Sequence, residues 1–191
     1  MRILITSGGT KIKIDTVRHI ANMSHGTFGS RIAMEALKRK HNVHFHYALH
    51  SKTPFTFNVD VFKDYNIIDL KDRLEEFIDS SLNLGERYSQ SSYDGFEDYE
   101  TSLKYLIINS KLFGYNFDAV ILAAAVSDYG VDNYVDGKIR TSGNMSINLK
   151  PLPKIISQIK KWDNNVKLVG FKLLVDSEDE ELISESKKKH T

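Results

Sequence analysis

The sequence predicts an α/β protein with a Rossmann-like, mainly parallel sheet that is flanked by helices. The apolar run at residues 3–5 is typical of a strand buried on both faces. Glycines follow this run at once, and a helical pattern of apolar residues begins after them. A second buried strand is expected at residues 119–122, again followed by small residues. Counting it as the fourth strand, we expect a flap after it.

The remaining elements are predicted from periodicity and turn residues. A first helix is expected at 26–40, with Ser24 as its N-cap and an inward stripe of Phe28, Ile32, Ala33, Ala36 and Leu37. Strands are expected at 43–49, 59–62, 145–149 and 166–174. Further helices are expected at 66–84, at 99–112 with Leu112 inward, after residue 150 and from 178 onward. Residues 85–98, rich in Ser, Tyr, Gly and acidic residues, are interpreted as a mobile surface loop.

Composition excludes several classes of function. The 191 residues suit one domain spanning 1–191, and the net charge of +1 does not call for nucleic acid or an anionic membrane as a partner. No apolar run approaches the roughly 20 residues of a membrane span, and no signal peptide precedes the first strand, so we expect a cytoplasmic protein. The absence of cysteine excludes disulfides, thiolate metal sites and an enzyme-bound thioester.

Two histidines, His44 and His46, share one face of the strand expected at 43–49. A metal site is one interpretation, but no carboxylate or cysteine completes a ligand set. A polar strand face is the interpretation we favour, and we expect no protein metal site.

Two glycine clusters flank the connection between the first strand and the first helix. Gly8 and Gly9 precede it, and Gly26 and Gly29 open the helix. Backbone amides at a glycine-flanked helix start form an anion site, which predicts phosphate binding, with Ser24 adding a hydroxyl. A glycine turn that merely connects strand to helix is the alternative. The long insert between the clusters distinguishes the pattern from the ordinary dinucleotide fingerprint.

The second informative stretch follows the strand at 119–122. Ala123, Ala124 and Ala125 leave room for a ligand to touch backbone at the carboxyl end of a strand, and Asp128 follows them. The alternative is that the alanines serve close packing alone and that Asp128 is a turn residue.

The chain resembles the phosphopantothenoylcysteine synthetase family at these two stretches. The matching N-terminal residues are Ser7, Gly8, Gly9, Thr10, Ile14, Asp15, Val17, Arg18, Ile20, Asn22, Ser24, Gly26 and Gly29. The segment A-A-V-x-D-Y is also similar, as are Lys138 ten residues after Asp128 and the V-G-F that ends in Phe171. His25 departs from the expected serine, Gly130 from a basic residue and Arg140 from a lysine. Family members continue for a few dozen residues, so the chain looks short at its C-terminus.

The resemblance implies a ligase that joins phosphopantothenate to cysteine through an acyl-cytidylate, releasing pyrophosphate and CMP. It implies CTP or ATP as co-substrate, Mg²⁺ with the triphosphate, and a homodimer. The catalytic residues would be Asn22 and Lys138. The implied nucleotide contacts are Gly8, Gly9, Ser24, Gly26, Gly29, Ala123, Ala124, Asp128, Lys138, Pro153, Lys154, Ile155, Ile156 and Phe171. The implied substrate contacts are Arg18, Asn22, Ala124, Ala125 and Asp128, with Arg18 reaching the substrate phosphate across the dimer interface.

For three of these residues, an interpretation without a role in binding or catalysis stays open. Arg18 would form a surface ion pair with Asp15, Asn22 would be a loop-capping residue, and Lys154 would be a solvated charge at a helix end. Two other functions also stay open. One is a nicotinamide- or flavin-dependent reductase, and the other is a truncated, non-catalytic relative that binds a nucleotide or a partner.

Overall fold

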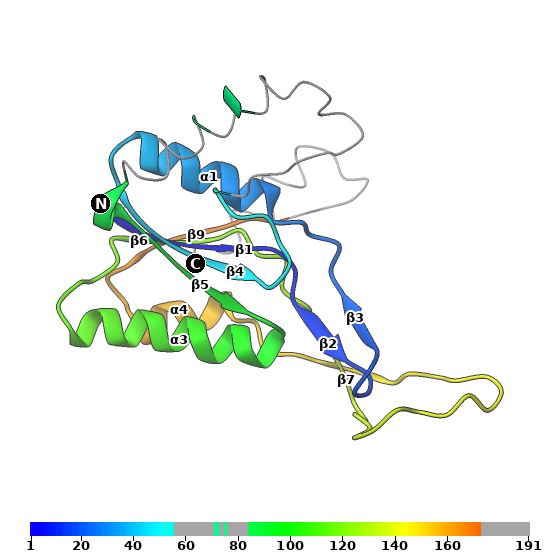
Figure 1. The fold of residues 1–191 in the computed structure, drawn as a ribbon. Helices are drawn as coiled ribbons and strands as arrows, with labels where there is room; N and C mark the ends of the chain where they lie inside the picture. Colours follow the sequence, from blue (N-terminus) through cyan, green and yellow to red (C-terminus); the bar gives the residue numbers. More distant parts are fainter. Residues whose placement is uncertain (56–70, 73–74, 76–83, 173–191) are drawn as a thin grey trace, which may run out of the picture.

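A five-stranded parallel sheet forms the centre of the molecule, in a computed structural model that describes residues 1–55, 71–72, 75 and 84–172 (Figure 1). The strand order is β5-β4-β1-β6-β9, which confirms the predicted mainly parallel sheet. The strands are β1 (Arg2–Ser7), β4 (Asn42–Ala48), β5 (Tyr88–Tyr93), β6 (Ala119–Leu122) and β9 (Lys167–Gly170). The expected strand at 59–62, most of the helix at 66–84 and the helix from 178 lie outside the described residues.

Helices cover both faces of the sheet. Helix α1 (Thr27–Lys38) lies on one face, and α3 (Phe96–Leu112) and α4 (Ile156–Trp162) lie on the other (Figure 1). Strand β1 contributes to both apolar cores because its side chains alternate between the faces. Ile3 and Ile5 face Ala33 and Leu37 of α1, and Leu4 belongs to the core with α3 and α4. No helix in the described part of the chain is long and apolar enough to cross a membrane.

The first helix begins differently from the prediction. Its N-cap is Gly26, in the left-handed conformation with φ 76°, and not Ser24. A side chain at this position would also meet Ser7 Oγ at 3.0 Å, so both the backbone conformation and the space favour glycine. Phe28 was expected in the core, but it is 55% exposed. The prediction for Leu112, at the end of α3, was also wrong, since that side chain is 73% exposed.

The interpretation of residues 85–98 as a mobile loop is wrong. A short 3-10 helix (Gly85–Arg87) leads into β5, an edge strand that pairs with β4 in parallel, and Phe96 already starts α3. Tyr93 is completely buried and its hydroxyl donates to the Ser7 carbonyl at 2.7 Å. Serine and tyrosine are turn-like in composition, but here their hydroxyl groups bond to neighbours across the sheet.

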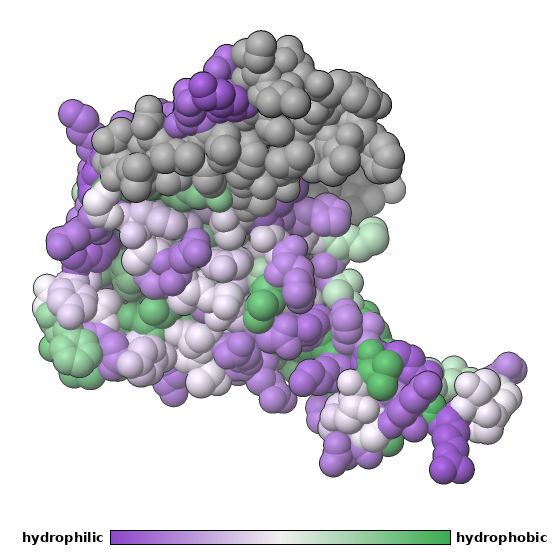
Figure 2. All heavy atoms as spheres, viewed as in Figure 1, coloured by the Kyte–Doolittle hydropathy of each residue, from purple (hydrophilic) through white to green (hydrophobic). Residues whose placement is uncertain are grey.

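Two antiparallel hairpins project from the sheet and form what we call the arm (Figures 1 and 2). One hairpin is β2 (Lys11–Lys13) with β3 (His19–Ala21), and the other is β7 (Tyr129–Val131) with β8 (Leu149–Pro151). The second hairpin follows β6, where the flap was predicted. The strand expected at 145–149 is therefore misplaced, because pairing with β7 begins only at Leu149.

Candidate active site

A cavity of about 880 Å³ opens at the carboxyl ends of β1 and β6. The chain runs from β1 to β4 on one side of β1 and later returns to β6 on its other side, so this edge is the switch point at which open α/β sheets bind ligands. The volume suits a nucleotide-sized ligand. The lining residues are Asn22, Met23, Ser24, His25, Gly26, Thr27, Phe28, Tyr99, Leu122, Ala124, Ala125, Val126, Ser127, Asp128, Pro153, Lys154, Ile155, Ile156, Gly170, Phe171 and Lys172.

Most of the predicted contact residues meet in this cavity. The segment from Asn22 to Gly26, the β6 end, the start of α4 and Phe171 come together there. Six predicted residues do not line it: Gly8, Gly9, Arg18, Gly29, Ala123 and Lys138. Ala123 lies between lining residues, and its backbone N–H donates to the Thr6 carbonyl at 3.1 Å.

The Asn22 side chain is fixed by the backbone that follows β6. Its Nδ2 donates to the Ala125 carbonyl at 2.7 Å and lies 3.5 Å from Ser127 Oγ. Its backbone N–H donates to the Thr10 carbonyl at 3.2 Å, which ties the residue after β3 to the residue before β2. Asn22 therefore joins two chain segments and still faces the cavity.

Glycines allow this close approach. A Cβ on Gly9 would lie 2.4 Å from the Asn22 carbonyl oxygen, and a Cβ on Gly29 would lie 2.4 Å from Ser7 Oγ. Gly8, with φ 88°, would meet Ala48 and Ser51 in the same way. These glycines therefore set the path of the backbone around the cavity. The start of α1 supplies the free amides of its first turn, at Thr27 and Phe28, to the cavity wall.

Two aromatic rings form one wall of the cavity. Phe28 and Phe171 meet edge to face, with ring centroids 4.9 Å apart, and both are more than half exposed. Exposed apolar rings that border a cavity are suited to contact a flat ligand such as a nucleobase. Phe171 was expected here from the family resemblance, whereas the helical period placed Phe28 in the core, because periodicity alone does not separate a core face from a cavity wall.

Two oppositely charged side chains line the cavity and form an ion pair. Lys154 Nζ forms an ion pair with Asp128, and both side chains are largely exposed. A triphosphate that entered here would compete with Asp128 for the lysine. Within the described residues no cluster of three or more His, Asp or Glu side chains is arranged to hold a metal ion.

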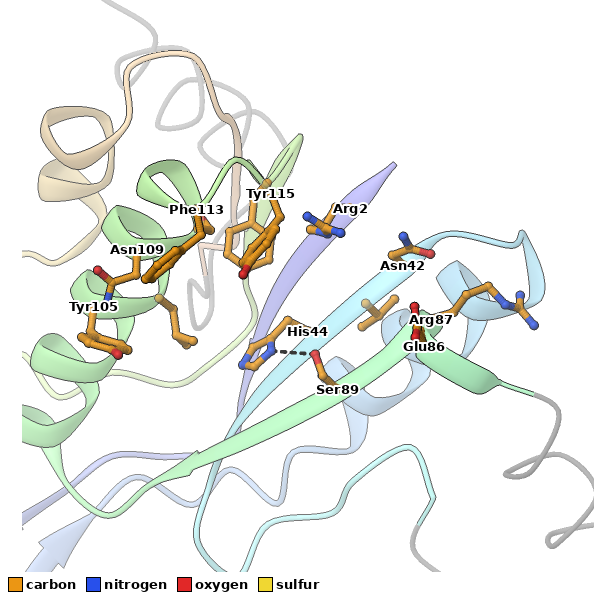
Figure 3. Close-up of a pocket in the computed structure, with 14 residues that line it drawn as sticks. Arg2, Asn42, His44, Glu86, Arg87, Ser89, Tyr105, Asn109, Phe113 and Tyr115 are labelled. Carbon is orange, nitrogen blue, oxygen red and sulfur yellow. Dashed lines mark hydrogen bonds between the residues drawn. The ribbon is translucent and has the colours of Figure 1, made fainter.

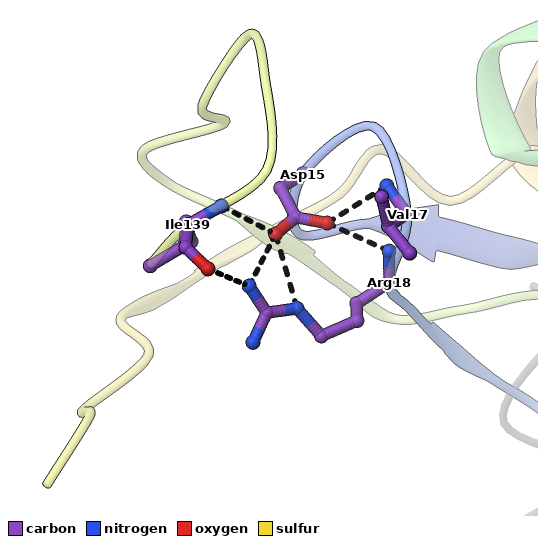
Figure 4. A network of polar contacts seen from close by, with 4 residues as sticks. All are labelled: Asp15, Val17, Arg18 and Ile139. Carbon is purple, nitrogen blue, oxygen red and sulfur yellow. Dashed lines mark hydrogen bonds and ion pairs between the residues drawn. The ribbon is translucent and has the colours of Figure 1, made fainter. Parts of the chain in front are cut away.

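Arg18 lies on the arm between β2 and β3 (Figure 4), and Lys138 lies in the connection between β7 and β8. The buried Asp15 carboxylate accepts from Arg18 Nε at 3.0 Å, from Arg18 Nη2 at 2.6 Å, and from the backbone of Val17, Arg18 and Ile139. The Arg18 guanidinium is the main reason that the Asp15 pKa is held far below its usual range. Lys138 is exposed beside this network, which joins the two hairpins.

A second cavity, of about 410 Å³, lies at the opposite end of the sheet (Figure 3). It is lined by His44 and by the exposed rings of Tyr105, Phe113 and Tyr115. His44 bonds to Ser89 Oγ and Ser91 Oγ at 2.8 Å each, and His46 behind it is completely buried, so the expected polar strand face is largely covered. Parallel sheets bind ligands at the carboxyl edge, which favours the first cavity as the active site.

The fold and the cavity together define a class: an open α/β protein whose ligand site lies at the switch point of a parallel sheet. The comparisons with known proteins give the family. Residues 1–63 and 109–191 match the DFP family, described as the DNA/pantothenate metabolism flavoprotein C-terminal domain. The chain belongs to this family.

Its relatives include enzymes of coenzyme A biosynthesis. It is 33% identical over 187 residues to the coenzyme A biosynthesis bifunctional protein CoaBC of Thermococcus kodakarensis, covering 98% of this chain and 38% of that protein. It is 30% identical over 217 residues to the phosphopantothenate–cysteine ligase CAB2 of Saccharomyces cerevisiae, covering 91% of this chain and 58% of that protein. The chain thus spans roughly two to three fifths of these curated relatives.

Solved structures show the same fold. A variant of Cab2 in complex with phosphopantothenate-cysteine has a TM-score of 0.76 at 25% identity, covering 98% of this chain and 68% of that one. The DNA/pantothenate metabolism flavoprotein from Streptococcus pneumoniae has a TM-score of 0.71 at 24% identity, covering 99% and 76%.

Several residues of the cavity lining were not predicted from the sequence, among them Ser127, Phe28 and Tyr99. Ser127 belongs to the segment A-A-A-V-S-D. Its hydroxyl group is the one among small residues at the end of a strand, and this could have indicated a ligand contact. Tyr99 is completely buried on α3, and its hydroxyl lies 3.3 Å from Thr6 Oγ1 on β1, a contact between distant segments that no local pattern indicates.

Proposed function

We propose that this protein is a cytoplasmic ligase that joins phosphopantothenate to cysteine at the cavity beside β1 and β6. The main support is that Asn22, the start of α1, the β6 end and Phe171 line one cavity of nucleotide size. The family and the printed activity of the CAB2 relative support the same reaction.

The reaction has two chemical steps. First, a carboxylate oxygen of phosphopantothenate attacks the α-phosphorus of CTP, the bond to the β-phosphate oxygen breaks, and pyrophosphate leaves with the electron pair. Second, the cysteine amine attacks the acyl carbonyl carbon, the bond from that carbon to the phosphate oxygen breaks, and CMP leaves while the amine loses a proton. Both steps depend on positioning and charge stabilisation.

The cavity residues fit these needs. The α1 amides and Ser24 would hold phosphate oxygens, and Gly8, Gly9 and Gly29 would act by shaping that loop. Lys154 would leave Asp128 for the triphosphate, and Phe28 and Phe171 would contact the base. Asn22 would donate to the acyl oxygen.

We propose CTP rather than ATP as the nucleotide, with Mg²⁺ bound to it. Among the described residues that line the cavity, Asp128 alone carries a carboxylate group. A single carboxylate suits a magnesium ion that is held mainly by phosphates and water. The magnesium ion would neutralise charge on the phosphates. Lys138 would supply a further cation from the arm.

We also propose a homodimer built through the arm. Apolar side chains with exposed fractions of 41–61% gather there: Val17, Ile20, Tyr134, Val135, Met145 and Leu149. Arg18 supports a role across such an interface, because Asp15 and the Ile139 carbonyl hold its Nε and Nη2 (Figure 4). Its other terminal nitrogen, Nη1, makes no hydrogen bond within the described residues and could donate to a substrate phosphate of the partner subunit.

The experiment combines ligand binding and product analysis. Thermal shift with CTP, ATP, NADPH and FMN separates a ligase from a reductase, since a ligase should be stabilised by CTP and not by NADPH or FMN. Pyrophosphate release and amide formation are then measured with CTP, phosphopantothenate and cysteine. Binding of CTP without pyrophosphate release would indicate a non-catalytic relative. Stabilisation by NADPH or FMN alone would overturn the proposal.

A further inference from the structure

The Ser127 side chain brings a hydroxyl group to the cavity, beside the Asn22 amide. It lines the cavity, and its Oγ lies 2.9 Å from the Oγ1 of Thr10 and 3.5 Å from the Nδ2 of Asn22. Its backbone N–H donates to the same Thr10 Oγ1 at 2.8 Å. The direction of the bond between the two hydroxyl groups decides what Ser127 can offer a ligand.

Thr10 settles that direction because it is completely buried. Its Oγ1 already accepts from the Ser127 N–H, and a buried hydroxyl proton needs an acceptor. Among the described residues, the acceptor within hydrogen-bond distance of Thr10 Oγ1 is Ser127 Oγ. Thr10 therefore donates to Ser127, and the Ser127 proton remains available to a ligand in the cavity.

Asn22 offers a second donor beside it. The Ala125 carbonyl accepts from Asn22 Nδ2 at 2.7 Å and so takes one of its two protons. The other N–H has Ser127 Oγ at 3.5 Å, the outer limit for a hydrogen bond, so it remains open to a better-placed acceptor in the cavity. Two donor atoms 3.5 Å apart can bond to one oxygen placed between them.

We propose that the Ser127 O–H and the second Asn22 N–H form a two-donor site for the carbonyl oxygen of the activated acyl group. This inference rests on the proposed ligase function and adds Ser127 to its catalytic residues. When the cysteine amine attacks the acyl carbon, the C=O electron pair moves to that oxygen. The two donors stabilise the negative charge until the carbonyl re-forms and the bond to the CMP phosphate breaks, with CMP carrying away the electron pair and the amine proton passing to solvent.

The test compares Ser127→Ala with Ser127→Thr in the full chain. Loss of the hydroxyl is expected to slow amide formation about ten- to a hundredfold, because it removes a hydrogen bond to a developing charge. CTP affinity should stay within about twofold, since the donors contact the acyl group. Ser127→Thr keeps the hydroxyl and should recover most of the rate. Ser92→Ala, which removes an exposed hydroxyl on β5, is the matched control.

Each outcome is decisive. Amide formation by Ser127→Ala at the wild-type rate would overturn the two-donor site and leave the ligase intact. A loss of CTP affinity in proportion to the loss of rate, measured by titration with CTP alone, would also overturn it, since the hydroxyl would then serve the nucleotide or the loop. A wild-type protein that forms no amide with CTP or ATP would overturn the ligase and this inference together.

Discussion

Asn22 shows how one side chain depends on the backbone around it. Its amide is oriented by the Ala125 carbonyl, and its main chain is bonded to Thr10. The carboxamide supplies one donor to the protein, and its second N–H lies beside Ser127 Oγ in the cavity lining. Loop capping and ligand contact are not exclusive roles at this position.

For Asn22→Ala, we expect pyrophosphate release from CTP to continue while amide formation falls about a hundred- to a thousandfold, the usual effect of losing an oxyanion donor. Both products are measured in one reaction. Asn164→Ala, at an exposed asparagine in the connection between α4 and β9, is the control and should behave as the wild type does. Amide formation at the wild-type rate by the Asn22 variant would exclude this residue from the mechanism.

Substitution of Gly9 should also slow amide formation strongly, although Gly9 does not line the cavity. In Gly9→Ala the new methyl group would meet the Asn22 carbonyl oxygen at 2.4 Å, and backbone must shift because no flexible side chain is there to yield. A shift of about 1 Å can cost on the order of a hundredfold in rate, and we expect a loss of this size in amide formation. Circular dichroism and thermal unfolding check that the variant still folds. An active Gly9→Ala protein would show that the Asn22 position is not critical.

At the scale of elements, the pairing of β4 with β5 encloses two histidines, His46 completely and His44 in part. His46 bonds to Ser91 Oγ and Ser102 Oγ at 2.8 Å each, and His44 contacts the same strand. Burial is the main cause that lowers the pKa of each histidine to about 4; for His46 the neighbouring His44 adds to this, and Ser91 and then Asp98 partly oppose it. Both rings are therefore neutral in the folded protein at neutral pH.

These histidines predict acid sensitivity. Between pH 6.5 and about 4 the unfolded chain binds protons that the folded protein does not, so stability falls as the pH falls. The slope is up to about 1.4 kcal/mol per pH unit for each group. We expect His46→Gln to flatten the fall of the thermal midpoint over this window, whereas His19→Gln, at an exposed site on the arm, should leave it unchanged. An identical slope in the His46 variant would contradict this explanation.

At the scale of the whole molecule, the arm projects from the sheet and exposes apolar side chains (Figure 2). The Asp15 network makes it one unit, because Arg18 and the Ile139 backbone tie the two hairpins together. A projection of this kind is suited to bind a second copy.

We therefore expect a native mass of twice the 21.8 kDa chain by light scattering. Val17→Asp places a charge in the proposed interface, at a side chain that is 61% exposed in the single chain, and should yield monomers. Leu112→Asp, at an apolar side chain that is 73% exposed at the end of α3, is the matched control and should remain dimeric. Monomeric wild-type protein would exclude the arm as a dimer interface.

The pattern of residues was sufficient to predict the parallel sheet, the first helix and the cavity contacts at Ser24, Gly26 and the end of β6, whereas the contacts at Asn22, at 153–156 and at Phe171 came from the family resemblance. Buried parallel strands have long apolar runs and glycines mark close approaches, so β1, β6 and the loops after them could be recognised locally. The same local reasoning failed at β5, whose polar residues are satisfied by His44 and His46 on a neighbouring strand.

Tertiary structure alone placed Ser127 between Thr10 and Asn22, put Phe28 beside Phe171, and carried Lys138 and Arg18 out onto the arm. These positions depend on contacts between segments more than a hundred residues apart, and neither apolar periodicity nor residue spacing records which side chains such contacts bring together. The sequence therefore determined which chemical groups the functional side chains carry. Their arrangement around one cavity was decided by the pairing of the strands in the tertiary structure.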